Sequence, residues 1–174
     1  GLAKLKKKIF ERVLESPVLE RNEHDAFLTA TSCVLKENGV FRMWYVSGDG
    51  WSSKNNETLP KYNIKYAESK DCITWKRSGK ICIDYKSKNE FALARPCIIK
   101  HKKKYMLWYS YKSYNKEYKI GYAESNDGFK WKRFDEKVIF LPRKNHEWEK
   151  EMQAYPHVFR HKKDLYMLYN GNGY

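Results

Sequence analysis

Short apolar runs separated by polar turns divide the chain into paired segments. Residues 40–46, 105–109 and 165–169 are rich in β-branched and aromatic side chains, which favour strands. Each run follows a short polar turn, and an earlier apolar run precedes that turn, at 33–35, 97–99 and 157–159. The pattern therefore predicts three β-hairpins. No long amphipathic helix is indicated, because the one segment with helical spacing, 4–14, aligns better with a hairpin described next.

A second hairpin pattern lies between copies of the first. The segment 66–77 reads YAESKDCITWKR and returns at 122–133 as YAESNDGFKWKR, an offset of 122 − 66 = 56 residues. Each copy predicts a strand, a polar turn and a further strand that carries Trp75 or Trp131. Four antiparallel strands that recur about every 60 residues are typical of β-propeller blades. We therefore predict an all-β fold, a partial β-propeller of four-stranded antiparallel blades.

The phase of the repeat predicts how the single propeller domain or fragment is divided. Residues 1–19 form an outer half-blade, 20–83 and 84–140 form whole blades, and 141–174 form an inner half-blade. Half-blades leave open edges, and a stable protein must cover them. Earlier blades of a longer chain would do so, and we favour this interpretation. The alternatives are terminal hairpins that complete one another, within a chain or between chains, and a homodimer that closes a ring from two chains.

Composition supports a packed domain of 174 residues, with 41% hydrophobic and 16% aromatic residues. No apolar run approaches the roughly 20 residues of a membrane span, and no secretory signal is visible, so we expect a cytoplasmic protein. The four cysteines form no CxxC pair, which favours free buried thiols over a structural disulfide.

The net charge of +14 could attract nucleic acid or another acidic polymer. Only eight of the 35 basic residues are Arg, which specific phosphate and base contacts prefer. The charge is therefore better explained by a solvated Lys-rich surface, and nucleic acid is an unfavoured partner.

Several motifs together resemble a known superfamily. They are Arg95-Pro96-Cys97 in an inner strand, Leu107-Trp108-Tyr109 in the second strand, and the outer hairpin from Ile120 to Trp131. The combination is similar to the five-bladed β-propeller superfamily of arabinanases, invertases, levansucrases and mannoside phosphorylases, and most similar to its glycosidase-like propellers. The resemblance implies about five blades, of which this chain would hold the last three. It also implies a carbohydrate or polysaccharide partner and a glycosidase-like activity.

One carboxylate precedes each predicted inner strand, at Asp25, Glu90 and Glu151. Glycoside hydrolysis requires a carboxylic acid that protonates the leaving oxygen and a second carboxylate that acts as nucleophile or base. By resemblance, Glu90 is the candidate general acid, Asp25 the base or modulator, and Glu151 a third catalytic candidate. The superfamily's first-blade Asp has no match here. The alternative is that these acids pair with the many Lys side chains.

Other polar and aromatic residues near the inner strands could bind substrate. Exposed rings can stack on a sugar face, and cations and amides can bind hydroxyls; packing between blades is the alternative role for the rings. The candidates are Arg95, Tyr155, His157, Trp51, Trp148 and Asn170, with the two Trp residues expected in polar loops. We expect no metal and no cofactor, since no histidine spacing suits a metal site.

Three functions remain open at this point. The first is a glycoside hydrolase-like protein that acts on a glycosidic bond by carboxylate acid/base catalysis. The second is a non-catalytic carbohydrate-binding propeller, and the third is a basic-surface binder of acidic polymer or nucleic acid. The Ser-x-Asp-Gly-x-x-Trp turn at 125–131 resembles the Asp-box of sialidases, and we expect Asp127 to bond backbone amides in a structural role.

Overall fold

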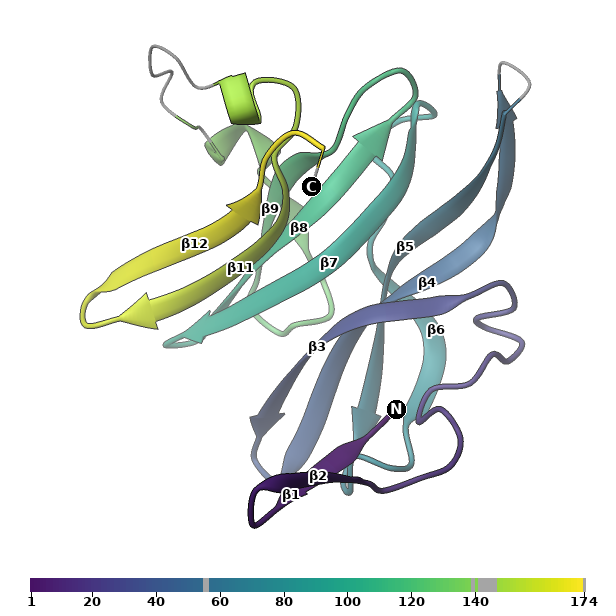
Figure 1. Cartoon of the computed structure of the whole chain (residues 1–174), viewed down its shortest axis with the longest axis vertical. Coiled ribbons are helices and arrows are strands. Elements are labelled where there is room, and N and C mark those ends of the chain that lie inside the picture. The colour runs from purple at the N-terminus through teal and green to yellow at the C-terminus, as the bar shows by residue number, and fades with distance from the viewer. Residues whose placement is uncertain (55–56, 139, 141–146, 174) are drawn as a thin grey trace.

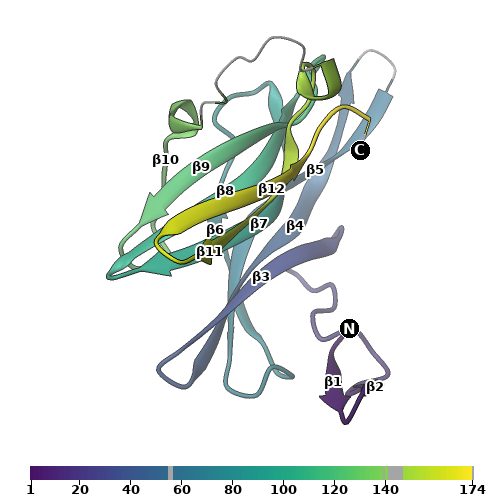
Figure 2. The ribbon, with the colours of Figure 1, turned by 60° about the vertical axis from the view of Figure 1, so that its left-hand side comes forward.

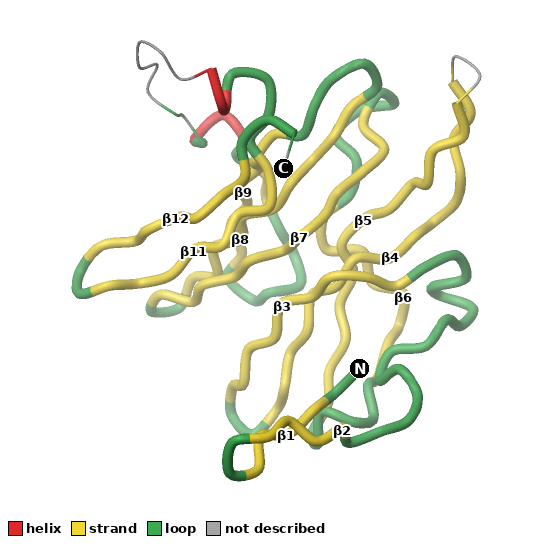
Figure 3. The backbone as a smooth tube through the Cα atoms, viewed as in Figure 1, coloured by secondary structure: helices red, strands yellow, loops and turns green. Residues whose placement is uncertain are grey.

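Antiparallel strands account for most of the chain in the computed structural model, which describes residues 1–54, 57–138, 140 and 147–173. Figure 3 shows strands along most of the trace, with two short 3-10 helices, η1 (Asp135–Lys137) and η2 (Glu147–Glu149). The predicted all-β class is therefore confirmed.

Two four-stranded antiparallel units form the centre of the molecule. The first blade consists of β3 (Thr29–Glu37), β4 (Val40–Lys54), β5 (Glu57–Ser69) and β6 (Lys76–Ile83). The second blade consists of β7 (Glu90–His101), β8 (Lys104–Ser113), β9 (Lys119–Ser125) and β10 (Lys132–Arg133). Within each blade every strand pairs with the next, and one parallel pair, Tyr62 with Ala92, joins the blades.

Two-stranded hairpins stand at the two ends of this array. One is β1 (Ala3–Lys6) with β2 (Ile9–Arg12), and the other is β11 (Ala154–His161) with β12 (Asp164–Asn170). Figures 1 and 2 show β11 alongside β7, whereas β1 and β2 lie near the first blade at the opposite end. The hairpin prediction for 4–14 is confirmed. The blade boundaries stay a prediction, and the one at 140–141 lies outside the described residues.

The main apolar core lies between the two blades. Side chains alternate across a strand, so one face of β4 and β5 meets one face of β7 and β8. Trp44, Ile64, Leu93, Leu107 and Tyr109 are fully buried there. Burying one such side chain stabilises a fold by about 1.5–3 kcal/mol, so this interface supplies much of the stability of the array.

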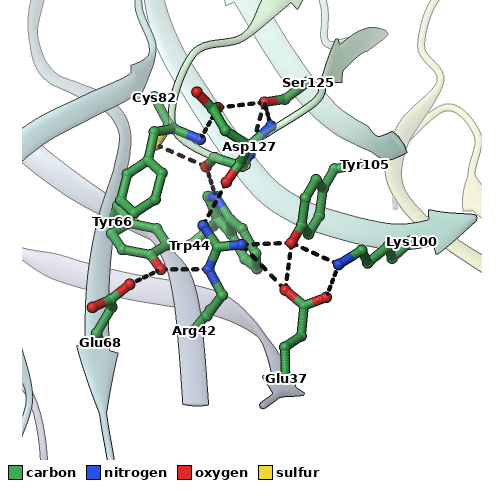
Figure 4. Close-up of polar contacts among 12 residues, drawn as sticks. Glu37, Arg42, Trp44, Tyr66, Glu68, Cys82, Lys100, Tyr105, Ser125 and Asp127 are labelled. Atoms are coloured by element: carbon green, nitrogen blue, oxygen red, sulfur yellow. Dashed lines mark hydrogen bonds and ion pairs between the residues drawn. The ribbon is translucent and has the colours of Figure 1, made fainter. Parts of the chain in front are cut away.

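Arg42 on β4 fastens the first blade to the second (Figure 4). Its guanidinium donates hydrogen bonds to the Tyr66 hydroxyl at 2.5 Å, the Tyr105 hydroxyl at 2.6 Å and the Asp127 carbonyl oxygen at 2.6 Å. It also pairs with Glu37 at 3.1 Å and lies over several aromatic rings. A buried cation needs such partners, and here they come from both blades.

The turn that precedes Trp131 has the predicted structural role. The Asp127 carboxylate accepts hydrogen bonds from the Phe129 and Lys130 amides, both at 2.8 Å, and the Trp131 indole donates to the Gly128 carbonyl oxygen at 2.9 Å. The same contacts recur in the first blade around Asp71. The prediction of a structural role for this turn is confirmed.

Cysteine side chains connect neighbouring inner strands. The Ile98 amide of β7 donates to Cys33 Sγ of β3 at 3.4 Å, and the Val158 amide of β11 donates to Cys97 Sγ at 3.1 Å. All four cysteines are free, as predicted, but only Cys82 and Cys97 are fully buried, whereas Cys33 and Cys72 are partly exposed. Burial raises the pKa of Cys33 to about 11, so this thiol stays protonated and inert at neutral pH.

Candidate functional site

The three inner strands β3, β7 and β11 each contain a β-bulge at the same point of the repeat. The pairing register shifts between Thr29 and Ser32, between Ala94 and Cys97, and between Ala154 and His157. A bulge bends its strand and changes the direction of a side chain, and bulges are frequent next to functional sites. The predicted inner strands thus share a β-bulge, and the bulged segments are candidates for a functional site.

Two bulges hold a non-glycine residue in the left-handed region. The φ angle is 53° at Arg95 and 55° at Tyr155, and each residue precedes a proline. This conformation costs an L-residue about 1–2 kcal/mol, and such strain gathers where function requires it. The Arg95 amide donates to Thr31 Oγ1 of β3 at 3.2 Å, and the Tyr155 amide donates to Ser110 Oγ of β8 at 2.7 Å. The bulges are therefore fixed by the neighbouring strands.

Among the described residues, the Arg95 guanidinium has no hydrogen-bond or ion-pair partner, and its side chain is exposed. His157, also exposed, stacks on Phe159 with ring centroids 6.2 Å apart. The Tyr155 ring lies 5.7 Å from that of Tyr118. These three substrate-binding candidates thus lie within the bulged segments of β7 and β11, with a cation available to a ligand.

Asp25 is completely buried in a polar cluster formed by side chains of β4, β5 and β6. Its carboxylate accepts hydrogen bonds from Ser47 at 2.6 Å and Tyr45 at 3.0 Å, and pairs with Arg77 at 2.7 Å and Lys65 at 3.4 Å. Burial alone would raise the pKa of Asp25, but these hydrogen bonds and cations outweigh it and hold the pKa below its usual value. The contacts are those of an anchoring residue.

Glu90 is similarly occupied at the start of β7. Arg133 of β10 donates to both of its oxygens, at 2.6 and 2.9 Å, and the Lys86 amide donates to one of them at 2.8 Å. Arg133 also pairs with Asp135 at 2.8 Å. Both oxygens of Glu90 accept hydrogen bonds from the same arginine, so these contacts favour a structural role.

Glu151 is exposed, and its carboxylate has no hydrogen-bond or ion-pair partner within the described part of the chain. Asn172 shapes the segment by accepting the Glu151 and Met152 amides at 3.0 and 2.9 Å. No hydrogen bond or ion pair between described residues joins Asp25, Glu90 and Glu151 to one another. The described residues also hold no group of three or more His, Cys, Asp or Glu suited to a metal ion.

The remaining candidates are exposed. Trp51 is 59% exposed, but it lies on strand β4 and not in the loop that its polar neighbours predicted. Trp148 is 53% exposed on η2, and its ring stacks on Tyr169 at 5.8 Å. Asn170 is exposed at the end of β12, opposite Ala154 of β11.

Sequence reasoning missed the two arginines that hold the buried carboxylates. Arg77 and Arg133 end the two copies of the repeated segment, so their recurrence was visible. Their partners lie 52 and 43 residues away, at Asp25 and Glu90, and belong to different parts of each blade. The repeat signal therefore indicated the cations but not the carboxylates with which they pair.

No described helix has the length and apolarity to cross a membrane.

The chain has curated sequence relatives of greater length. No protein-family model matches the chain. Uncharacterized protein MT1551 of Mycobacterium tuberculosis is 34% identical over 167 residues, which cover 95% of this chain and 54% of that protein. The chain thus spans about half the length of the curated relatives it matches.

Solved structures give the fold. A thermostable family-43 glycoside hydrolase superposes with a TM-score of 0.70 at 18% identity, over 95% of this chain and 54% of that protein. Zg3597, a family 117 glycoside hydrolase of the marine bacterium Zobellia galactanivorans, superposes with a TM-score of 0.67 at 20% identity, over 89% and 52%. The fold is that of the propeller glycosidases. The three predicted inner strands are neighbours in this structure, since β7 contacts both β3 and β11. Identities this low show the fold alone, so chemistry must be argued from side chains.

Proposed function

We propose that this chain is part of a carbohydrate-active, glycosidase-like propeller that holds a glycan beside the bulges of its inner strands. The observation that carries the proposal is the pair of left-handed bulges at Arg95 and Tyr155. Both residues keep a strained backbone, and the Arg95 side chain is exposed and unpaired among the described residues. A guanidinium and a phenol offer hydrogen bonds and an apolar face, which together suit a sugar.

Exposed groups near the same strands extend the proposed site. His157 follows the β11 bulge, Asn170 lies opposite the start of β11, and Trp148 precedes it along the chain. Trp148 presents a half-exposed ring that is held by its stacking on Tyr169. We assign these side chains to glycan binding, because fixed rings and short polar groups recognise sugars at little entropic cost.

Hydrolysis of a glycosidic bond is the reaction that we propose for the whole protein. It needs two carboxylates across one pocket, about 5–10 Å apart. Of the three candidates Glu151 is the most available, since its carboxylate is exposed and unpaired among the described residues. Asp25 and Glu90 remain catalytic candidates, but their ion pairs with Arg77 and Arg133 support a second proposal. In that proposal these blades bind glycan without cutting it.

Binding and cleavage are tested separately on the natural-length protein. Affinity electrophoresis in gels containing arabinan, β-mannan, levan or pectin measures binding, and release of reducing ends measures hydrolysis. We expect retardation by at least one polysaccharide, and loss of that retardation in Arg95→Ala. Arg12→Ala is the matched control, because it also removes an exposed arginine, but from the hairpin β1–β2 at the other end of the array.

Each outcome separates the candidate functions. Cleavage that Glu151→Gln abolishes supports hydrolysis, whereas retardation without cleavage supports the binding function. Retardation that is equal in Arg95→Ala and Arg12→Ala, and that disappears when the salt concentration is raised, would instead indicate a basic-surface binder of acidic polymers.

A further inference from the structure

Two hairpin turns carry a concentration of positive charge at the ends of β7 and β11. Residues 100–104 read KHKKK where β7 turns into β8, and residues 160–164 read RHKKD where β11 turns into β12. Together they hold seven basic residues and one acid, Asp164, a net charge of +6 against +14 for the whole chain. We call these two turns the lysine edge. The sequence alone suggested a solvated Lys-rich surface, whereas the structure gathers these lysines in one place.

The two turns of the lysine edge lie against each other. Arg160 donates a hydrogen bond from Nη2 to His101 Nδ1 at 3.4 Å, which joins the second turn to the first. The strands that lead into the turns are also in contact, through the Val158 amide and Cys97 Sγ at 3.1 Å. Figures 1 and 2 show the ends of the two hairpins next to each other. Their charges therefore form one continuous surface.

The lysines at the two tips are available to a partner. Lys100 and Lys104, at the base of the first turn, pair with Glu37 at 2.6 Å and with Glu124 at 2.8 Å. The four lysines at the tips are exposed, and their ammonium groups have no hydrogen-bond or ion-pair partner among the described residues. These four are Lys102, Lys103, Lys162 and Lys163. Their charge is therefore not neutralised within the described part of the chain.

The backbone at both tips has a conformation that is unfavourable for lysine. The φ angle is 55° at Lys102 and 55° at Lys162, each the first of the two residues that join the paired strands. An L side chain is strained there, and two-residue turns favour Gly or Asn at such positions. The β3–β4 turn has this preferred chemistry, Asn38-Gly39, whereas the β1–β2 turn repeats a lysine pair with φ 56° at Lys7. Local folding does not explain lysine at these positions, so the reason must lie in its charge.

Exposed apolar side chains flank the second tip. Leu165 is 39% exposed and follows the tip by two residues. Phe159 and Tyr166 pair across the hairpin with their rings stacked at 5.9 Å, and they are 38% and 46% exposed. Lysines beside exposed aliphatic and aromatic side chains suit a membrane–water interface, where the cations bind lipid phosphates and the rings lie at the level of the headgroups.

The lysine edge favours a lipid surface over nucleic acid. Lysine supplies charge without the bidentate geometry of arginine, and Arg160, the one arginine of the edge, already contacts His101. Single-stranded nucleic acid is held in a charged groove with stacking rings, whereas these lysines stand at the tips of hairpins. Charges on projecting tips fit a planar anionic surface, to which each lysine adds about fivefold in affinity.

We propose that the lysine edge docks this protein on the surface of an anionic phospholipid membrane. The four tip lysines bind the lipid phosphates, and Leu165 lies at the boundary between headgroups and acyl chains. The contact is peripheral, because it uses the tips of two hairpins. It does not involve Arg95 or Tyr155, whose bulges lie earlier in β7 and β11. The inference is therefore independent of the proposed glycan function, and either can fail without the other.

Co-sedimentation of the natural-length protein with vesicles tests this proposal. The vesicles consist of phosphatidylcholine, with or without phosphatidylglycerol as the anionic lipid. We expect binding only where phosphatidylglycerol is present, and weaker binding as the salt concentration rises. Replacing one tip, by Lys102→Gly with Lys103→Asn, should weaken binding about 25-fold. Because glycine relieves the left-handed strain, this variant should unfold at the same temperature as the parent or higher, which separates lost binding from misfolding.

The control variant removes the same charge from the other end of the second blade. Lys88→Ala with Lys116→Ala deletes two exposed lysines, one before β7 and one between β8 and β9, and should leave vesicle binding close to that of the parent. Equal weakening in the control and the tip variant would mean that total charge drives binding, and would overturn the inference. So would equal binding to vesicles of phosphatidylcholine alone. Duplex DNA and polygalacturonate are the rival probes, and binding to either through the tips, without binding to vesicles, would overturn the assignment to lipid.

Discussion

The ion pair between Glu90 and Arg133 yields the sharpest prediction, because it separates a structural carboxylate from a catalytic one. Glu90→Gln preserves the side-chain size and replaces one acceptor oxygen with an NH₂ group that faces the guanidinium. Both partners are nearly buried, with exposed side-chain fractions of 5% and 12%. Removing one partner of a buried pair typically costs about 3–5 kcal/mol.

The expected cost here is smaller, because Arg133 keeps other acceptors. Asp135 still accepts at 2.8 Å and the Asp84 carbonyl oxygen at 2.9 Å. We therefore expect Glu90→Gln to lower the free energy of unfolding by about 2–3 kcal/mol. In a domain of this size that corresponds to a fall in Tm of about 4–12 °C.

Urea unfolding followed by tryptophan fluorescence and by circular dichroism measures this change, and agreement of the two probes checks that unfolding is two-state. Glu151→Gln is the matched control, since its exposed carboxylate has no partner among the described residues and its loss should change stability by less than about 0.5 kcal/mol. A Glu90→Gln protein that unfolds like the parent but has lost glycosidase activity would refute the structural role.

Two further predictions concern other parts of the fold. A methyl group on Gly128 would lie 2.8 Å from Arg42 Nη2, whereas one on Gly39, which has an equally left-handed backbone, would have no atom within 4 Å. Gly128→Ala should therefore lower the free energy of unfolding by about 1–3 kcal/mol more than Gly39→Ala does. Equal losses in urea unfolding would contradict this. The pKa of Asp25 is lowered by folding, so its stabilisation is complete above the unfolded value of about 4 and is lost as pH falls through the folded value. Asp25→Asn should therefore be less stable than the parent at pH 7 and show a weaker loss of stability on acidification, and an unchanged pH profile would exclude this role.

Much of the fold follows from the sequence, because the repeat makes local patterns consistent with one another. Alternating apolar residues and polar turns predicted the hairpins, and the recurrence of the Asp127 turn predicted its backbone contacts. The length of β4 and β5 was not predictable in the same way. Beyond Gly48 these strands carry mostly polar residues, so their apolar pattern ends before their pairing does. Trp51 therefore looked like a loop residue.

The candidate site could be predicted only in outline. Proline after Arg95 and Tyr155 indicated equivalent positions, but the left-handed backbone depends on acceptors at Thr31 and Ser110 that lie 64 and 45 residues away. The carboxylates that precede the inner strands looked alike in sequence. Long-range partners then distinguish them, since Asp25 and Glu90 meet arginines, whereas Glu151 meets none among the residues that the structure describes.

The contacts of Arg42 also bear on how the protein opens. One guanidinium joins β4 to the turn between β9 and β10 and to the Tyr105 hydroxyl at the start of β8, and its Tyr66 bond holds β5 at the same point. The blades therefore cannot slide past one another by breaking bonds one at a time, because release of the cation exposes all of these acceptors together. In hydrogen exchange, the amides of both blades around Arg42 should therefore exchange together, as one cooperative unit. We expect neither blade to open there without the other.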